Sequence, residues 1–156
     1  MINRKITLML VISMLVLSFL SAGCGGGSGA QRVSGLSSDS VVKAFFEAAK
    51  AGQLNQAALY VSPSSTNNPQ TVMKYLTGQS GLNELKKSNL LSLKKITEQG
   101  NYAVVVATLQ PEQNDLALTV KPVALEKMNG EWYIIDLDKI YQDSKYLLLQ
   151  QLLNKI

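Results

Sequence analysis

Leu125-Glu126-Lys127-Met128-Asn129-Gly130-Glu131-Trp132-Tyr133-Ile134-Ile135 is the stretch that decides the fold of this chain. Asn129 and Gly130 both tolerate the positive φ that a type I′ turn requires, and apolar residues lie on either side of them. The stretch therefore predicts a β-hairpin, whose returning strand covers residues 131–137. The residues of that strand expected to reach a core are Trp132, Ile134 and Leu137, with Tyr133 on the other face.

Three more extended segments precede this returning strand. Residues 90–98 and 102–110 predict two strands joined by the turn Gln99-Gly100-Asn101, and residues 116–128 predict a third. Pro122 has no N–H to donate to a neighbouring strand, so we expect an edge position or a bulge there. The positions of the first strand expected near its inner face are Leu91, Leu93 and Ile96. The apolar positions of the third strand are Leu118, Val120 and Leu125.

Helical patterns come before the strands. Ser38, Asp39 and Ser40 are candidate N-caps, because their short oxygens can accept the free N–H groups of a first turn. Apolar residues then recur at helical spacing until Gly52, which ends the helix. Shorter helices are predicted over residues 54–61 and 70–76. The apolar residues of the three helices are Val41, Val42, Phe45, Phe46, Ala48, Ala49, Leu54, Ala57, Ala58, Val61, Val72, Met73 and Leu76. Helices followed by an antiparallel meander predict the α+β class.

Residues 141–155 predict a terminal amphipathic helix. Its apolar arc contains Tyr141, Tyr146, Leu148, Leu149, Leu152, Leu153 and Ile156, and Leu147 lies outside it. Two interpretations stay open. The helix either covers the sheet or packs on the first helix, or it detaches and binds a partner or the membrane surface.

The chain begins with the pattern of an export signal. Arg4 and Lys5 precede an apolar run over residues 6–20, and small residues follow. Leu20-Ser21-Ala22-Gly23-Cys24 resembles the lipobox of bacterial lipoproteins. This resemblance implies cleavage between Gly23 and Cys24 and acylation of Cys24, with chains such as palmitate. Two alternatives are an uncleaved membrane anchor over residues 6–23 and an ordinary thiol at Cys24.

The domain organisation follows from this beginning. Residues 1–23 are the expected lipoprotein signal peptide. Residues 24–38 carry the lipidated cysteine and a Gly/Ser-rich stretch without hydrophobic periodicity, which predicts a flexible tether. Residues 39–156 are then a single domain, anchored to a cell membrane through the lipid and facing outside the cytoplasm. The sequence does not decide between an inner and an outer membrane.

Composition excludes several classes of function. The chain has no His, which excludes a His-based catalytic triad and a His-containing metal site. Removal of Arg4 and Lys5 leaves 13 of the 15 Lys and Arg residues, against 11 Asp and Glu residues. The exported part therefore has a net side-chain charge of only +2. We find no basic run interleaved with aromatics, and therefore expect no nucleic-acid partner. No metal or cofactor is predicted.

Two segments resemble the nuclear transport factor two-like superfamily. Ser40-Val41-Val42-Lys43-Ala44-Phe45-Phe46-Glu47-Ala48-Ala49-Lys50-Ala51-Gly52 resembles its opening helix, and the hairpin of residues 125–135 is similar to its final hairpin. The resemblance implies a conical fold, in which a strongly bent antiparallel sheet of about four strands wraps around the first helix and leaves a pocket. Exported lipoproteins of unknown function are one group of this superfamily. No reaction is implied, because enzymes and binding proteins share the fold.

Two non-catalytic functions follow as expectations. The domain is an interaction module that forms a homodimer or binds another envelope protein, or it carries or senses a small apolar ligand. The candidate pocket residues are Phe45, Phe46, Met73, Tyr102 and Trp132. A filled interior would argue against a ligand, and an empty cavity of several hundred Å³ would argue for one. An isomerase or dehydratase would depend on Asp136 or Asp138, and a raised carboxyl pKa would support it.

Overall fold

The computed structural model describes residues 29–63, 69–112 and 116–156. The predicted signal peptide and the predicted cleavage and lipidation positions, Gly23 and Cys24, lie outside them. The described residues have the predicted α+β architecture, with one antiparallel sheet of four strands in the order β1-β2-β3-β4. The elements, in chain order, are α2 (Ser38–Lys50), α3 (Leu54–Ala58), α4 (Pro69–Thr77), α5 (Leu82–Lys86), β1 (Ser88–Gln99), β2 (Tyr102–Pro111), β3 (Thr119–Met128), β4 (Glu131–Ile135), α6 (Leu137–Gln142), the 3₁₀ turn η1 (Ser144–Tyr146) and α7 (Leu147–Leu153).

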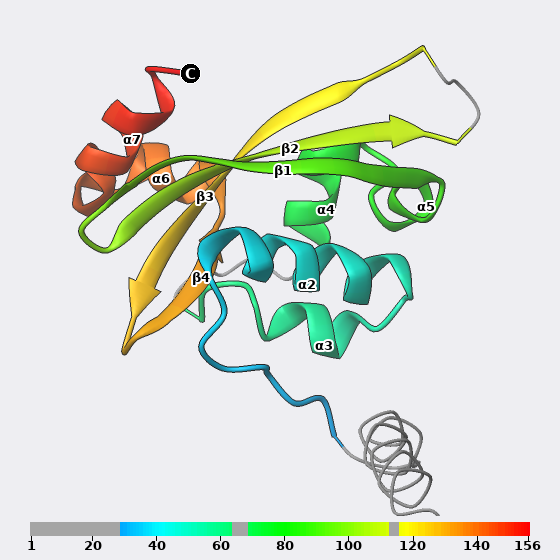
Figure 1. Ribbon diagram of the computed structural model, residues 1–156, viewed down its shortest axis with the longest axis horizontal. Helices are drawn as coiled ribbons and strands as arrows, with labels where there is room; N and C mark the ends of the chain where they lie inside the picture. Colours follow the sequence, from blue (N-terminus) through cyan, green and yellow to red (C-terminus); the bar gives the residue numbers. More distant parts are fainter. Residues whose placement is uncertain (1–28, 64–68, 113–115) are drawn as a thin grey trace, which may run out of the picture.

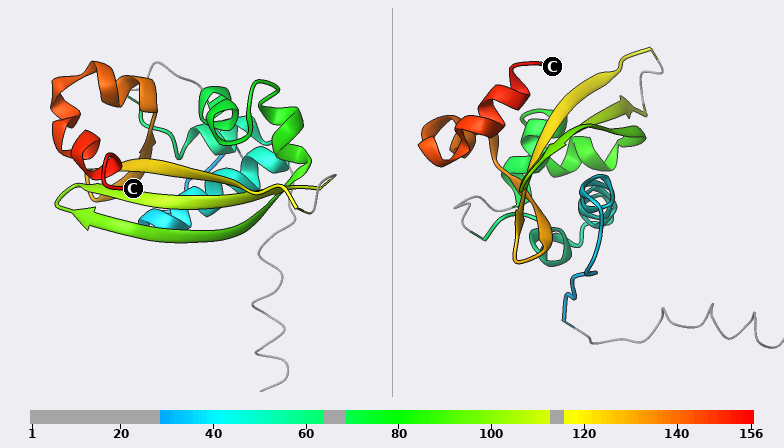
Figure 2. Two further views of the ribbon diagram at one scale, coloured as in Figure 1. Left: turned by 90° about the horizontal axis from the view of Figure 1, so that it is seen from above. Right: turned by 60° about the vertical axis from the view of Figure 1, so that its left-hand side comes forward.

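Helices cover the sheet from both sides (Figures 1 and 2). The inner face lies against α2 to α5, and the outer face lies against the C-terminal segment, which comprises α6, η1 and α7. Alternate residues of each strand supply the two cores, because neighbouring side chains of a strand point to opposite faces. In β2, for example, Val105 joins the inner core and Val104 joins the outer one.

Helix α2 follows its apolar pattern closely. All six predicted core residues of this helix are buried. The N-cap is Ser37 rather than Ser38, Asp39 or Ser40, because the N–H of Val41 already bonds to the Ser37 carbonyl at 2.9 Å. Gly52 ends the helix as predicted, with a φ of +77° in the left-handed region that favours glycine.

Helix α3 is shorter than predicted because the chain after it pairs with the sheet. The N–H of Ile134 bonds to the Tyr60 carbonyl, and the N–H of Ser62 bonds to the Ile134 carbonyl, both at 2.9 Å. Val61 therefore forms a parallel bridge with Ile134 instead of ending a helix. As a consequence Ala58 is exposed, contrary to prediction, and Tyr60 is buried. In α4 the prediction for Val72, Met73 and Leu76 is confirmed, since all three are buried.

Strand β1 contains two irregularities that overturn two predicted core positions. The pairing register with β2 shifts between Leu90 and Ser92 and again between Lys95 and Thr97. Each shift leaves one extra residue in β1, and these residues are Leu91 and Ile96, both exposed. Leu93 packs against the inner core as predicted.

The β3–β4 hairpin has the predicted turn. Asn129 and Gly130 have φ values of +51° and +85°, and Met128 pairs with Glu131. Strand β3 is paired with β4 only from Ala124 onward, so the edge position expected at Pro122 is confirmed on that side. The hydroxyl of Tyr75 donates to the Pro122 carbonyl there at 2.9 Å.

The beginning of β3 and the end of β4 differ from prediction. Strand β3 begins at Thr119 rather than at Leu116 and extends beyond the C-terminal segment, so the apolar residues Leu118 and Val120 are exposed. Strand β4 ends at Ile135 and Leu137 opens α6, so the predicted strand was two residues too long.

The C-terminal residues do not form the single helix predicted over 141–155. The chain is extended at Asp143, whose carboxylate accepts from the N–H of Lys145 at 2.9 Å and caps η1. Tyr141, on the near side of this break, and Ile156, past the end of α7, are exposed rather than part of one apolar arc. Of the two open interpretations, the structure shows the segment covering the sheet, where α7 contacts β2 and β3.

A buried glutamate joins the C-terminal segment to the sheet. Glu126 of β3 accepts from the Tyr146 hydroxyl at 3.1 Å and from Lys145 Nζ at 2.7 Å. This ion pair and hydrogen bond satisfy both carboxylate oxygens, which a buried charge requires. The pKa of Lys145 is raised, chiefly by its hydrogen bond to Glu126.

Candidate functional site

The predicted pocket residues divide between the two faces of the sheet. Phe45, Phe46, Met73 and Trp132 meet in the inner core, where all four are buried. Tyr102 lies on the outer face instead and packs edge-on against Tyr146, with 6.2 Å between ring centroids. The prediction for Tyr102 is therefore wrong, because it alternates with Ala103 along β2 and Ala103 takes the inner position.

Side chains fill the inner core. The space between α4, β3 and the end of β4 has a volume of about 10 Å³, lined among others by Tyr75, Ile134 and Asp136. That is room for about one water molecule. The larger depressions of about 600 Å³ and 300 Å³ are open to solvent at the molecular surface. The four gathered pocket residues thus form packed core rather than the wall of a ligand cavity.

Asp136 is the titratable group most deeply placed at this small space. It is 5% exposed, and its Oδ1 accepts from the N–H of Asp138 at 3.2 Å as the N-cap of α6. Its Oδ2 is buried and has no partner among the described residues. Burial raises the pKa of Asp136, and burial also raises that of Tyr75 to about 12. The adjoining volume is too small for a substrate, so the geometry fits a helix cap better than a catalytic acid.

We expect Asp136→Asn to raise the free energy of unfolding at neutral pH. Asn caps a helix as well as Asp does, and it removes a charge whose burial is unfavourable. Since burial raises the carboxyl pKa in the folded state, the wild type should be most stable below the unfolded pKa and lose stability as pH rises through the folded pKa. Urea denaturation across the acidic range measures this, and the variant should lack that loss. Asp138→Asn, at an exposed position, serves as control. A variant less stable than wild type at neutral pH would contradict the expectation.

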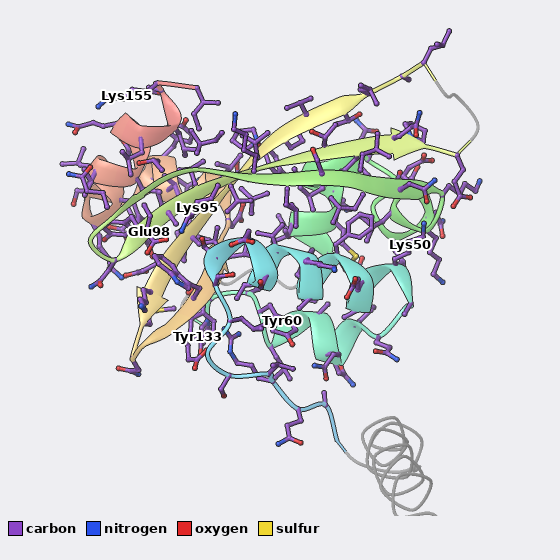
Figure 3. All side chains as sticks on the ribbon, viewed as in Figure 1. Lys50, Tyr60, Lys95, Glu98, Tyr133 and Lys155 are labelled. Carbon is purple, nitrogen blue, oxygen red and sulfur yellow. The ribbon has the colours of Figure 1, made fainter. Side chains whose placement is uncertain are left out.

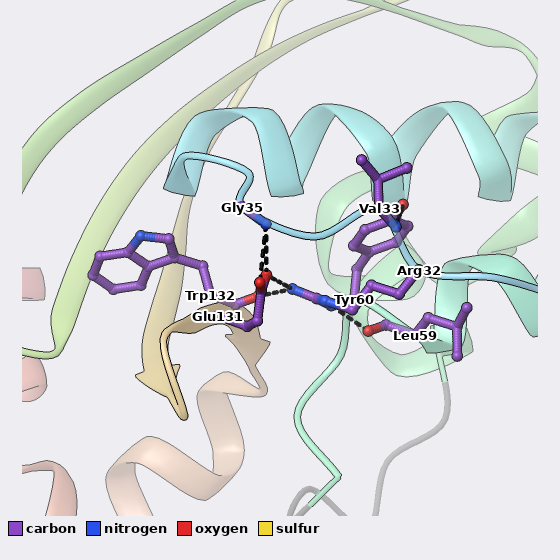
Figure 4. A network of polar contacts seen from close by, with 7 residues as sticks. All are labelled: Arg32, Val33, Gly35, Leu59, Tyr60, Glu131 and Trp132. Atoms are coloured by element: carbon purple, nitrogen blue, oxygen red, sulfur yellow. Dashed lines mark hydrogen bonds and ion pairs between the residues drawn. The ribbon is translucent and has the colours of Figure 1, made fainter.

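A clasp around Arg32 is the most extensively bonded polar arrangement outside the sheet, and the sequence did not suggest it. The guanidinium donates to the carbonyls of Leu59 and Trp132, and lies 3.7 Å from the Glu131 carboxylate (Figure 4). Only 14% of its side chain is exposed. Arginine suits such a position because its planar fork donates in several directions at once.

Two aromatic rings complete the Arg32 clasp. The guanidinium carbon lies 5.0 Å from the ring centre of Tyr60 and 4.2 Å from that of Tyr133, within the range of cation–π attraction. Tyr133, expected on the face away from the core, therefore has a defined partner. The one available signal was that Arg32 is the single charged residue between positions 25 and 38.

The residues beside Arg32 are also bound to the domain. Gln31 and Gln56 exchange two hydrogen bonds of 3.1 Å and 2.6 Å, and the N–H of Gly35 donates to Glu131 at 2.9 Å. Residues 31–35, part of the stretch expected to be tether, thus lie on α3 and β4. The exit point of the chain from the domain is at Gln31 rather than at Ser38.

The outer face offers a second candidate surface. The C-terminal segment covers Val104 and Ala124, but the next positions along the strands lie beyond it. There Val106 pairs with Pro122 and Thr108 with Val120, and Val120 is 59% exposed. We call these four residues the open strip. Val106, Thr108 and Pro122 are partly exposed. Apolar residues left uncovered on a sheet face can serve as a protein interaction site.

Within the described ranges no three His, Cys, Asp or Glu side chains group as metal ligands, and no helix there has the length and apolar character to span a bilayer. Comparison with models of protein families and with curated proteins finds no match for this chain.

Proposed function

We propose that this protein is a membrane-anchored lipoprotein whose small α+β domain is a non-catalytic module for binding another protein outside the cytoplasm. One observation carries the choice of a surface over a pocket. Four of the five residues expected to line a pocket are buried in the inner core, and the space of about 10 Å³ beside α4 is lined by other residues. An apolar carrier would need a cavity several tens of times larger. In the open strip, Val120 is exposed and Val106 and Pro122 are partly exposed, so a partner could cover these apolar residues.

The proposed fold family is the nuclear transport factor two-like superfamily. Its support is the order of elements, in which a long first helix contacts β1, β2 and β4, and the final hairpin turns at Asn129 and Gly130. We propose that the sheet is the bent wall of a cone whose interior is closed by α2 and α4. A cone closed in this way favours contact through its outer side.

The proposed anchor is the acylated Cys24, exposed as the new N-terminus when residues 1–23 are removed. Two acyl chains hold a protein on a membrane far more firmly than a single acyl chain does. The Arg32 clasp supports a further detail of the anchor. With residues 31–35 bound to the domain, only residues 25–30 are left to act as tether.

Cys24→Ala tests the anchor directly. We expect the variant to lose the lipid-anchored mature form, because no acyl chain can then be attached. It should either leave the membrane fraction as a non-lipidated protein or keep residues 1–23 and migrate as the larger uncleaved precursor. Fractionation of cells followed by immunoblotting measures both changes. Ser21→Ala, which keeps a small residue in the cleavage motif, is the matched control and should remain membrane-bound. A Cys24→Ala protein of unchanged mobility in the membrane would refute lipidation at this residue.

Photocrosslinking tests the interaction module. A photoreactive amino acid at Val120, in the open strip, should give a discrete crosslinked product in intact cells. The same amino acid at Leu147, equally exposed on α7, is the control and should give none. Mass spectrometry of the product then distinguishes a second copy of this chain from another envelope protein. Equal products at both positions, or none at Val120, would contradict the proposal.

A further inference from the structure

The exit point of the tether lies at one end of the domain, beside a pair of lysines. Residues 29–31 share a surface depression with residues 52–56. Gly52 in turn lies beside Lys86 of α5, since a Cβ placed on Gly52 would be 3.6 Å from Lys86 Nζ. The chain leading to the proposed lipid anchor therefore leaves the domain beside α3, next to the turn at Gly52 that the Lys86 side chain reaches.

The end of β2 belongs to the same region. Ser88 pairs with Pro111, and the N–H of Glu112 donates to the Lys87 carbonyl at 2.7 Å. Lys50, at the end of α2, joins the group through its bonds to the Ser88 carbonyl at 2.7 Å and to Glu112 at 3.3 Å. Figure 3 shows Lys50 at this end of the domain and Lys155 at the opposite end. We call the surface formed by Lys86, Lys87, Glu112 and the residues near them the tether end.

The tether end carries positive charge that the described residues leave uncompensated. Lys86 and Lys87 are both exposed, and neither forms an ion pair within the described ranges. Glu112 is engaged by Lys50, and Glu84 on α5 is the remaining opposing charge. Leu116, four positions after Glu112 in the sequence, has a side chain that is 94% exposed. Exposed lysines and an exposed leucine suit a surface of anionic headgroups above a hydrocarbon layer.

We infer that the tether end docks on the anionic lipid surface of the membrane to which the chain is anchored, with Lys86 and Lys87 against headgroups and Leu116 at the hydrocarbon boundary. This inference rests on the proposed anchor at Cys24. The six residues 25–30 span at most about 20 Å when extended, and about 13 Å as a random coil. The anchor thus holds the lysines near the lipid surface, and each lysine there strengthens docking about fivefold.

The test uses the full lipoprotein purified from membranes and reconstituted in vesicles. One set of vesicles contains phosphatidylcholine alone, and the other also contains anionic phosphatidylglycerol. Because Cys24 is the only natural cysteine and is acylated, Leu116→Cys provides a single thiol for an environment-sensitive fluorophore. Leu147→Cys, exposed on the C-terminal segment, is the control site. We expect a blue shift at position 116 in anionic vesicles only, and none at position 147.

Charge reversal gives the second measurement. The double variant Lys86→Glu, Lys87→Glu in the labelled protein should lower the ratio of docked to undocked protein on the vesicles at least tenfold. The reason is that two attractive charges become repulsive. Lys94→Glu with Lys155→Glu makes the same change of net charge away from the tether end and should alter this ratio less than twofold. Vesicle-bound protein whose label at position 116 remains as water-exposed as at position 147 would overturn docking and leave the anchor intact. Protein that does not stay on the vesicles would overturn the anchor itself.

Discussion

Phe45→Ala should lower the free energy of unfolding by about 3–5 kcal/mol, as truncation of a buried phenylalanine does in well-packed cores. Phe45 is 0% exposed and lies in the middle of α2, the helix that contacts three of the four strands. The loss combines the transfer of the ring to water with a cavity that the surrounding side chains cannot fully close. Since Phe45 is fully buried among other apolar side chains, the surrounding core should relax only partly after the substitution.

Urea denaturation of the protein without its signal peptide measures this loss. Leu147→Ala is the control, because its side chain is exposed on α7 and its removal should change stability by less than about 0.5 kcal/mol. A loss of less than about 1 kcal/mol in Phe45→Ala would mean that the interior is already loosely packed. In that event the ligand-carrying function would regain its basis.

Arg32→Ala should be the second most damaging single change, with an expected loss of about 2–4 kcal/mol. The substitution removes the donors that bind the carbonyls of Leu59 and Trp132, and leaves Glu131 without its cation. It also withdraws the cation from between the rings of Tyr60 and Tyr133. The Arg32 clasp joins residues far apart in the chain, so its loss should also release residues 31–35 from the domain.

Two measurements separate this effect from an ordinary surface substitution. Hydrogen exchange should accelerate at Gly35, whose N–H donates to Glu131 in the clasp. Arg32→Lys should recover only part of the stability, because an ammonium group keeps the charge but lacks the fork. Lys43→Ala, which breaks an exposed pair with Glu47, should cost less than about 0.5 kcal/mol. If Arg32→Ala were as mild as Lys43→Ala, the clasp would have no role in holding the chain.

Local patterns were sufficient where short-range geometry governs the structure. Asn129 and Gly130 determine their hairpin because both accept the positive φ of its turn, and Gly52 ends α2 for the same kind of reason. The helical spacing from Val41 to Ala49 determines which side of α2 is buried, since a helix of this regularity has one apolar stripe. The α+β class followed from these elements and their order.

Long-range pairing decided the rest. Leu91 and Ile96 are exposed because β1 gains one residue on β2 at each of them, and a change of register depends on the partner strand rather than on β1 alone. Tyr102 lies on the outer face of the sheet because of its position in the paired strand β2. The other four candidate pocket residues lie together in the inner core. Residues on both sides of the break at Asp143 pack on the outer face of the sheet. Other parts of the chain form that face, so the C-terminal sequence alone does not reveal the break.

The candidate site shows the same division between local and tertiary information. The sequence by itself supplied the basis of the proposed anchor, which is an apolar run after Arg4 and Lys5, a single cysteine, and a Gly/Ser-rich stretch after it. Only the tertiary structure decided where that stretch stops being a tether, because Arg32 acquires its partners from Leu59, Glu131 and Trp132 once the sheet is formed. An arginine among glycines and serines has no periodic pattern, and its role depends on distant partners such as the Trp132 carbonyl, 100 residues away.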